Sequence, residues 1–319
     1  MKSKNQSSTA KQIHSFKRTN ILKRYIPLYT MMIPGIVYLV INNYIPMGGL
    51  IIAFKKYNYS LGILDSPWAG FSNFEFLFRT NDAAKIIRNT LGYNIVFIIL
   101  GNIMAVTVAV MLNEVRSRQA KKIYQTLILI PYLISMVIVS YIGFAFLSQD
   151  SGFINNSILE PLGLDKIQWY TSPQYWPIIL TIVYLWKSFG YNSIIYFATV
   201  IGIDASLYEA AMVDGANKWK QIWHITLPGL KTTIITMVLL NMGRIFYSDF
   251  GLFYQVPMNS GPLIDITNTI DTYVYRGLTQ LNDIGRASAA GFIQSLVGFV
   301  VVFIANFIVS KIDKESSLF

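Results

Sequence analysis

Long apolar runs without a charged residue constrain the fold of this chain more than any other feature of its sequence. A helix needs roughly 20 mainly apolar residues to cross the hydrocarbon core of a bilayer, which is about 30 Å thick. Four uncharged runs reach this length: Tyr25 to Phe54, Asn89 to Asn113, Ile123 to Gln149 and Ala287 to Ser310. Each run predicts a transmembrane helix.

Two further apolar runs are interrupted by charge. Trp176 to Ile203 contains Lys187, and Thr232 to Phe253 contains Arg244 and Asp249. Charged residues make up 13% of the chain, about half the share that is usual in soluble domains. We count both runs as spans, so the sequence predicts an all-α integral membrane protein with six transmembrane helices.

The composition also excludes several kinds of site. The chain has no cysteine and two histidines, so no disulfide can form and no metal site is expected. The net charge of +10 would suit nucleic acid, but in a membrane protein the placement of Lys and Arg sets the orientation. We therefore expect a lipid bilayer around the protein and no nucleic-acid partner.

The distribution of charge predicts which ends face the cytoplasm. Seven basic residues and no acid precede the first span: Lys2, Lys4, Lys11, Lys17, Arg18, Lys23 and Arg24. By the positive-inside rule, residues 1–24 form a basic cytoplasmic tail, and six spans return residues 311–319 to the cytoplasm. Residues 55–88 then form an external loop between the spans at 25–54 and 89–113, although the bases of this loop do not follow the rule.

One cytoplasmic loop, residues 204–228, carries signals for short helices between the fourth and fifth spans. Ser206 and Glu209 have the spacing of a capping box, and Gly215 suits the left-handed position after a last helical turn. Pro228 fits the first turn of the fifth span. A second short amphipathic helix is expected between them, from the helical spacing of Trp219, Ile222 and Trp223.

A helix of about two turns is marginal in water, because nucleation is costly and tertiary packing normally supplies its stability. The first short helix therefore requires a protein to pack against. Its small residues allow close approach, its apolar residues offer contact, and its acids offer charge pairing: Ala210, Ala211, Leu207, Tyr208, Met212, Glu209 and Asp214.

The loop also resembles a known family. Glu209-Ala210-Ala211, Gly215, Ile225, Leu227 and Pro228 match the EAA loop of binding-protein-dependent ABC importer permeases. More narrowly, three runs resemble the LplB-type polysaccharide permeases, relatives of the maltose-importer permeases: Tyr44 to Leu50, Trp186 to Asn192 and Leu207 to Ala211.

The resemblance implies a type I importer in a bacterial cytoplasmic membrane, with residues 89–310 as its core. It further implies a second homologous permease, two copies of a cytoplasmic ABC ATPase, and an external lipid-anchored or periplasmic solute-binding protein. In that family the EAA loop seats a coupling helix in a cleft of the ATPase. The implied coupling residues are Leu207, Tyr208, Glu209, Ala210, Ala211, Met212, Asp214, Gly215, Leu227 and Pro228.

The energy source is expected to reside in another polypeptide. The chain has no Gly-x-x-x-x-Gly-Lys-Ser/Thr sequence, so the backbone cradle of a P-loop ATPase is missing. We therefore expect no catalytic residue and no bound cofactor here, with ATP and Mg on the partner ATPase.

Polar residues within the fourth and fifth spans are candidates for a substrate pathway. An Arg at the middle of a span is costly unless it faces protein or water, and helical spacing places Asn241, Arg244 and Ser248 on one face. The candidate pathway residues are Lys187, Tyr191, Asn192, Asn241, Arg244, Tyr247 and Asp249. Bonding between neighbouring helices is the alternative role for each of them.

The sequence thus predicts a permease subunit that passes a carbohydrate, expected to be an oligosaccharide, delivered by an external binding protein. Importers of a non-sugar small solute remain an alternative, because the EAA loop does not specify cargo, and Arg244 with Asp249 would also suit an anionic sugar. A secondary transporter would not need the EAA loop and often has two repeated halves. A membrane hydrolase would need a nucleophile motif that the chain lacks.

Overall fold

The computed structural model describes residues 25–76 and 81–312, and these ranges are helical throughout apart from turns and two isolated bridges. The predicted basic tail at 1–24 and residues 313–319 of the predicted carboxyl-terminal tail lie outside the described residues. Five helices are long and apolar enough to cross a membrane, and six if one sharply bent pair counts as a single span. The described part of the chain is therefore an all-α membrane domain, as predicted.

The first span, Tyr25–Phe54, ends irregularly. A regular helix over residues 25–39 passes into the π-helix η1 (Val40–Tyr44), the short α2 (Ile45–Met47) and the 3₁₀-helix η2 (Gly48–Phe54). Pro46 lies at the start of α2, where its missing N–H removes a helical hydrogen bond. Most of this span is exposed, so lipid or another subunit must cover it.

The segment after this span packs on the last helix, α14 (Ile284–Ile312). It contains α3 (Gly62–Asp65) and η3 (Ser72–Phe74). The ring centroids of Phe54 and Phe292 are 5.3 Å apart, and the amide of Asn73 donates to the carbonyls of Ala53 and Lys55 at 2.9 Å each. These contacts join the end of the first span to the start of the last.

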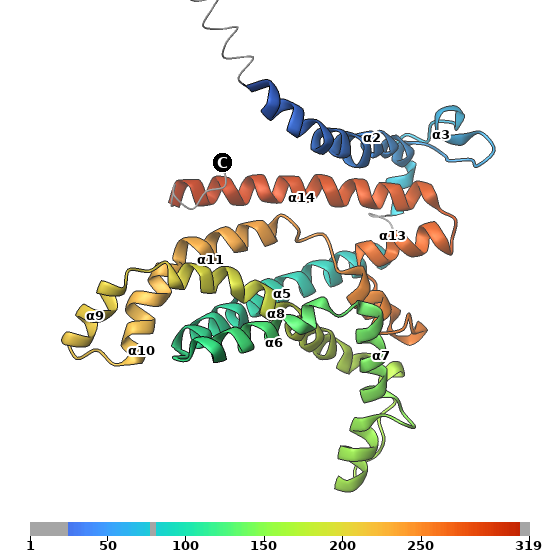
Figure 1. Cartoon of the computed structure of the whole chain (residues 1–319). Coiled ribbons are helices and arrows are strands. Elements are labelled where there is room, and N and C mark those ends of the chain that lie inside the picture. Colours follow the sequence, from blue (N-terminus) through green and yellow to red (C-terminus); the bar gives the residue numbers. More distant parts are fainter. Residues whose placement is uncertain (1–24, 77–80, 313–319) are drawn as a thin grey trace, which may run out of the picture.

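Two long helices, α5 (Asn81–Glu114) and α8 (Trp176–Ile201), form the centre of the domain (Figure 1). They approach closely where α5 carries the small residues Ala105 and Ala109, both fully buried. In lipid, such small residues let helix backbones pack tightly without a hydrophobic driving force from water. Phe97 and Tyr184 stack between the same helices, with ring centroids 3.9 Å apart.

The third apolar run is not one straight helix. The structure divides it into α6 (Arg118–Leu133) and α7 (Met136–Leu147), which meet at 92° (Figure 1). Pro131 lies inside the last turn of α6, and the Ser135 side chain accepts from the N–H of Ile138 to cap α7. A proline near the end of one helix and a serine cap at the start of the next together explain the break.

The fifth span is displaced from its predicted bounds. The helical stretch runs from Lys218 to Met242, whereas the apolar pattern suggested Thr232 to Phe253. It comprises α10 (Lys218–Gln221), the π-helix η8 (Ile222–Thr226) and α11 (Leu227–Met242). After Met242 the chain turns, so the apolar residues up to Phe253 belong to irregular structure.

Shorter elements complete the fold. The outer segment before α8 contains η4 (Asn155–Leu159), η5 (Glu160–Leu162), η6 (Trp169–Thr171) and η7 (Pro173–Tyr175). The loop after α8 contains α9 (Ala205–Val213). Between α11 and α14 lie η9 (Gly251–Gln255), η10 (Gly261–Leu263), α12 (Ile264–Thr267) and α13 (Ile270–Thr279).

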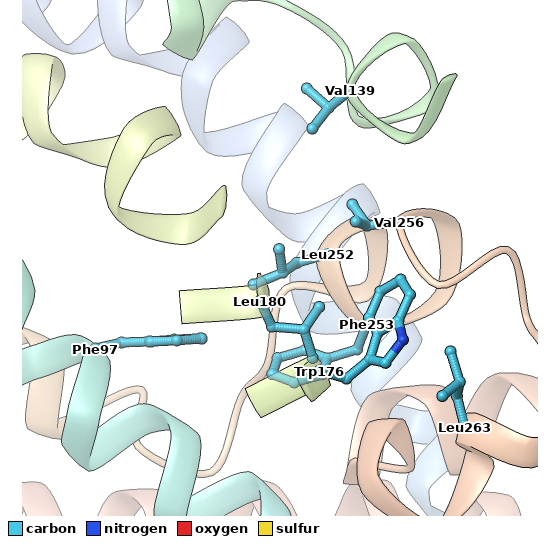
Figure 2. Close-up of a cluster of buried hydrophobic side chains, with 8 residues drawn as sticks. All are labelled: Phe97, Val139, Trp176, Leu180, Leu252, Phe253, Val256 and Leu263. Atoms are coloured by element: carbon cyan, nitrogen blue, oxygen red, sulfur yellow. The ribbon is translucent and has the colours of Figure 1, made fainter. Parts of the chain in front are cut away.

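A buried apolar cluster joins α7, α8, η9 and η10 to α5 (Figure 2). Trp176, Leu180, Leu252 and Leu263 are fully buried in it, and Phe253 is nearly so. The Trp176 indole N–H donates to the carbonyl of Trp169 at 2.7 Å, which leaves only its apolar body in the cluster. The cluster fixes the irregular segment after α11 against the body of the domain.

Candidate functional site

The helix α9 begins at a cap that the sequence pattern misplaced. Asp204 is the N-cap residue, and its Oδ1 accepts from the backbone N–H of Ser206 at 2.9 Å. Ser206 lies inside the first turn, so the predicted capping box of Ser206 and Glu209 is wrong. Aspartate and serine are both strong N-caps, and the helix starts at the earlier of the two.

Hydrogen bonds from the Ser206 backbone and side chain hold the pKa of the Asp204 carboxyl below its usual range. A carboxylate with a depressed pKa stabilises the folded state above its unfolded pKa, and this contribution is lost as the pH falls through the folded value. The cap is therefore fully charged at neutral pH.

The end of α9 matches the prediction for Gly215, which adopts φ of +75°. The N–H of Ala216 donates to the carbonyl of Ala211 at 2.8 Å, and the N–H of Gly215 donates to that of Met212 at 3.1 Å. This pair of bonds is a Schellman motif, in which a glycine takes the left-handed position without steric cost. Helix α9 is thus defined at both ends by local interactions.

The second short helix is continuous with the fifth span instead of separate from it. Asn217 caps α10 by accepting from the N–H of Lys220 at 2.9 Å, and η8 then carries the helix into α11. Pro228 lies in the first turn of α11, as predicted, directly after the π-turn. A π-turn absorbs the hydrogen bond that proline cannot donate, so the helix continues without a break.

No residue of α9 is buried within the subunit. Its exposed residues are Ala205, Ser206, Leu207, Glu209, Ala210, Met212 and Val213, and the five from Leu207 onward are here called the α9 surface. Leu207 is 53% exposed and Met212 is 56% exposed, so both apolar side chains lack cover within the subunit. Trp219 and Trp223 on the adjoining helix are also exposed.

The other coupling candidates connect the α9 surface to the fifth span. The hydroxyl of Tyr208 lies 3.0 Å from that of Thr226, the last residue of η8, and Leu227 is half-buried beside it. Ala211 is half-buried on the inner side of α9, while Asp214 and Pro228 are exposed. A displacement of α9 would therefore be transmitted to the start of α11 through the contact between Tyr208 and Thr226.

The predicted polar stripe on the fifth span is wrong. Asn241 lies in the last turn of α11, but Gly243 caps that helix. Arg244 follows in a turn, where its backbone N–H donates to the carbonyl of Asn241 at 3.0 Å. Ser248 lies beyond the turn, so these residues do not share a helix face. Glycine favours a helix end, which the apolar pattern did not register.

A polar network holds the chain just after this turn. The backbone N–H and hydroxyl of Ser248 both donate to Asp271 Oδ2, at 2.6 and 2.8 Å. The Gln294 amide donates to both carboxylate oxygens of Asp271 and to the carbonyl of Phe246. Asp271 was missed by the sequence pattern, although its place two residues after the Thr269 cap of α13 signals a helix start.

The remaining pathway candidates lie in different surroundings. Tyr191 stacks on Tyr132 with ring centroids 4.4 Å apart, and Asn192 is half-buried. The Tyr247 hydroxyl lies 3.1 Å from that of Ser295. The Lys187 ammonium donates to carbonyls at the end of α6.

Arg244 and Asp249 are both exposed, and the structure shows no ion pair between these two described residues. Asp249 Oδ1 instead accepts from the N–H of Leu252 at 3.1 Å, where it caps the segment that enters η9. Within residues 25–76 and 81–312, no group of three His, Cys, Asp or Glu side chains is placed to hold a metal ion.

Residues 97–314 match the family model described as "Binding-protein-dependent transport system inner membrane component". The chain is 35% identical to "Protein LplB" of Bacillus subtilis (strain 168) over 92% of each chain. It is 33% identical to the "Polygalacturonan/rhamnogalacturonan transport system permease protein YteP" of the same organism, over 94% of this chain and 93% of that one.

Two solved structures of a bacterial alginate transporter are similar to this chain, at 34% sequence identity. One is the transporter "involved in the import of the acidic polysaccharide alginate", with a TM-score of 0.83, covering 93% of this chain and 99% of that chain. The other contains an "alginate pentasaccharide-bound periplasmic protein", with a TM-score of 0.82, covering 92% and 98%. The similarity extends over more than nine tenths of the chain.

Proposed function

The chain belongs to the family of binding-protein-dependent transport system inner membrane components, and we propose that it is the permease subunit of an ABC importer for an oligosaccharide. It is a multi-pass protein of a bacterial inner membrane, and it is the permease component of its transporter, not the enzyme. The names and titles of the three relatives reported above that state a cargo give polysaccharides: polygalacturonan and rhamnogalacturonan for one permease, and alginate for the two solved transporters.

The observation that carries the proposal beyond family membership is the α9 surface. A capped two-turn helix with no fully buried residue gains little stability from its own subunit, so we expect a partner to pack on it. The partner is a cytoplasmic ABC ATPase, which binds ATP and Mg, and two copies of it serve two permeases. The second permease is proposed to be a homologue, as the family of transport system inner membrane components implies.

The path from ATP to the membrane runs through α9. When the ATPase dimer closes on nucleotide, it moves α9, and the Tyr208–Thr226 contact and the continuous α10–η8–α11 stretch transmit the motion to the fifth span. The permease pair then alternates between openings to the outside and to the cytoplasm. The external binding protein delivers the oligosaccharide when the outer side is open.

The cargo is proposed to be an oligosaccharide, and the transporter is proposed to accept oligosaccharides that contain acidic sugars. The transporters named above carry alginate and polygalacturonan, and Arg244 presents an exposed cation in the turn after α11. Tyr191 and Tyr247 are the aromatic and hydroxyl groups of the proposed pathway, with Asn192, Asn241 and Asp249 as its other polar groups. These assignments follow from residue chemistry and position.

Reconstitution of the full transporter tests the proposal. The chain, its partner permease, the ATPase and the binding protein are placed in proteoliposomes, and uptake is measured with acidic and neutral oligosaccharides of equal length. We expect uptake that requires ATP, the binding protein and both permeases, with ATP hydrolysis stimulated by the loaded binding protein. ATP hydrolysis by this chain alone, or uptake driven by an ion gradient without ATP, would refute the proposal.

A further inference from the structure

The break between α6 and α7 leaves backbone carbonyls without helical partners inside an apolar run. The last carbonyls of any helix lack an intrahelical donor, and α6 ends where α7 turns away by 92°. Within hydrocarbon, an unpaired backbone carbonyl is costly because no water can replace the missing bond. The Pro131 carbonyl accepts from the N–H of Ile134 at 3.3 Å, and the bend needs further donors for the carbonyls that follow it.

Lys187 of α8 supplies these donors. Its Nζ lies 3.3 Å from the carbonyl oxygen of Pro131 and 3.1 Å from that of Tyr132, and it also donates to the carbonyl of Ile134. A cation at a helix C-terminus interacts favourably with the partial negative charge of the helix dipole. The ammonium also lies 6.0 Å from the centroid of the Tyr132 ring.

An ammonium group has three N–H donors, and three carbonyls accept them here. Because every donor of Lys187 is occupied by the end of α6, none is left for a sugar hydroxyl or carboxylate. This geometry argues against the cargo contact that was expected for Lys187 from its sequence position.

The two halves of the broken span are held by different elements. One turn beyond Lys187, α8 passes so close to α6 that a Cβ on Gly190 would lie 1.7 Å from the carbonyl oxygen of Ile128. Helix α7 instead packs on η9, where a Cβ on Gly251 would lie 2.6 Å from Met136 Cγ. The junction between α6 and α7 is thus the point where two separately anchored pieces meet.

We infer that Lys187 is a positioning residue that fixes the break in the third span by binding the carbonyl end of α6. Ser135 caps the other side of the same break, so each helix end at the junction has a side-chain partner. The angle between α6 and α7, and with it the placement of the outer segment that follows α7, depends on the Lys187 ammonium. The uptake readout below rests on the proposed function, whereas the distance readout does not.

The natural absence of cysteine makes the angle measurable. Spin labels are attached in the assembled complex through Leu127→Cys on α6 and Tyr141→Cys on α7, both exposed positions, and their separation is measured by double electron–electron resonance. Lys187→Met removes the charge and the donors at similar length, Lys187→Arg keeps both, and Ser188→Ala is the control. The Ser188 hydroxyl donates to the Tyr184 carbonyl of its own helix, at 2.7 Å.

We expect Lys187→Met to shift or broaden the distance distribution and to lower uptake by about tenfold or more, the size of effect that a lost charge-assisted hydrogen bond produces. Lys187→Arg and Ser188→Ala should keep the parental distribution. If Lys187→Met does not assemble, assembly of Lys187→Arg with parental distances supports the inference. Parental distances in Lys187→Met, or a failure of Lys187→Arg to assemble, would overturn it, and reduced uptake at parental distances would mark Lys187 as a cargo ligand.

Discussion

Several polar side chains of the described domain bind backbone groups close to places where helices end or bend. Asn94 donates to the carbonyls of Ile245 and Tyr247, just beyond the end of α11, and Gln294 donates to that of Phe246. In lipid the backbone must find its partners within the protein, which gives these side chains a structural role. Arg244 and Asp249 differ because they are exposed, so they remain the better candidates for cargo contact.

The charge of Glu209 is expected to be essential for coupling. Glu209 is exposed on the α9 surface, and removing a charge that pairs inside an interface costs on the order of 3 to 5 kcal/mol by stranding the partner. Glu209→Ala should abolish ATP-driven uptake while membrane insertion persists. Glu160→Ala is the matched control, because Glu160 pairs only with Lys166 at an exposed outer site, 3.1 Å away. Parental uptake by Glu209→Ala would contradict the coupling role.

A single buried amide, Asn155, is expected to hold the outer segment after α7. It is fully buried, donates to the carbonyls of Gln149 and Ile167, and accepts from the backbone of Ile167 and the indole of Trp169. Asn155→Ala leaves several of these groups unpaired, at about 1 to 3 kcal/mol for each one that water does not reach. The melting temperature of the purified complex should fall, and Asn156→Ala, at a half-buried neighbour with fewer hydrogen bonds, should change it less.

At the scale of elements, short helices and broken helices carry most of the specificity of this fold. Helix α9 has both a cap and a Schellman end but no buried residue. Its boundaries are therefore set by local interactions, whereas its stability depends on contacts with other parts of the assembly. At the α6–α7 junction, Pro131 and Ser135 mark the position of the break locally. The angle between the two helices is set by their contacts with α8, including Lys187, and with η9.

The crossing of α6 and α8 is expected to depend on Gly190. Its Cβ position is occupied by the Ile128 carbonyl, so Gly190→Ala must push the two backbones apart, a change that costs about 1 to 3 kcal/mol or more. Gly92→Ala on α5 is the control, since nothing lies within 4 Å of its Cβ position and alanine favours a helix by about 1 kcal/mol. The temperature at which the complex unfolds in detergent should be lowered by Gly190→Ala and not by Gly92→Ala.

At the scale of the whole molecule, the described helices alternate in direction so that α9, α10 and the end of α14 lie towards one end, away from α3 and α13 (Figure 1). This arrangement agrees with a crossing count of six only if α6 and α7 together form one broken span. A re-entrant pair would return the chain to the side from which it started.

Single cysteines distinguish these two topologies in a chain that has none of its own. Arg116→Cys lies before α6 and Asp165→Cys lies after α7, both at exposed positions. With a membrane-impermeant maleimide, we expect Arg116→Cys to react only in inside-out vesicles and Asp165→Cys only in right-side-out vesicles. Labelling of both sites from the same side would show that the pair is re-entrant.

The sequence by itself determined the membrane class, the number of apolar runs, the position of the short helix near Gly215, and the family. These features are local: run length, turn residues and motif spacing are all read along the chain. The glycine at 215 could be placed because a left-handed residue after a helix is set by its own backbone.

Only the tertiary structure decided where the polar residues of the spans point. The sequence placed Asn241, Arg244 and Ser248 on one helix face, yet the helix ends at Met242, and Asp271 and Gln294, from later elements of the chain, hold the segment that follows. Likewise, Lys187 marked a span, but the carbonyls it binds lie more than 50 positions earlier. Helical periodicity assumes an unbroken helix, and the partners that break or mend a helix are brought together only by folding.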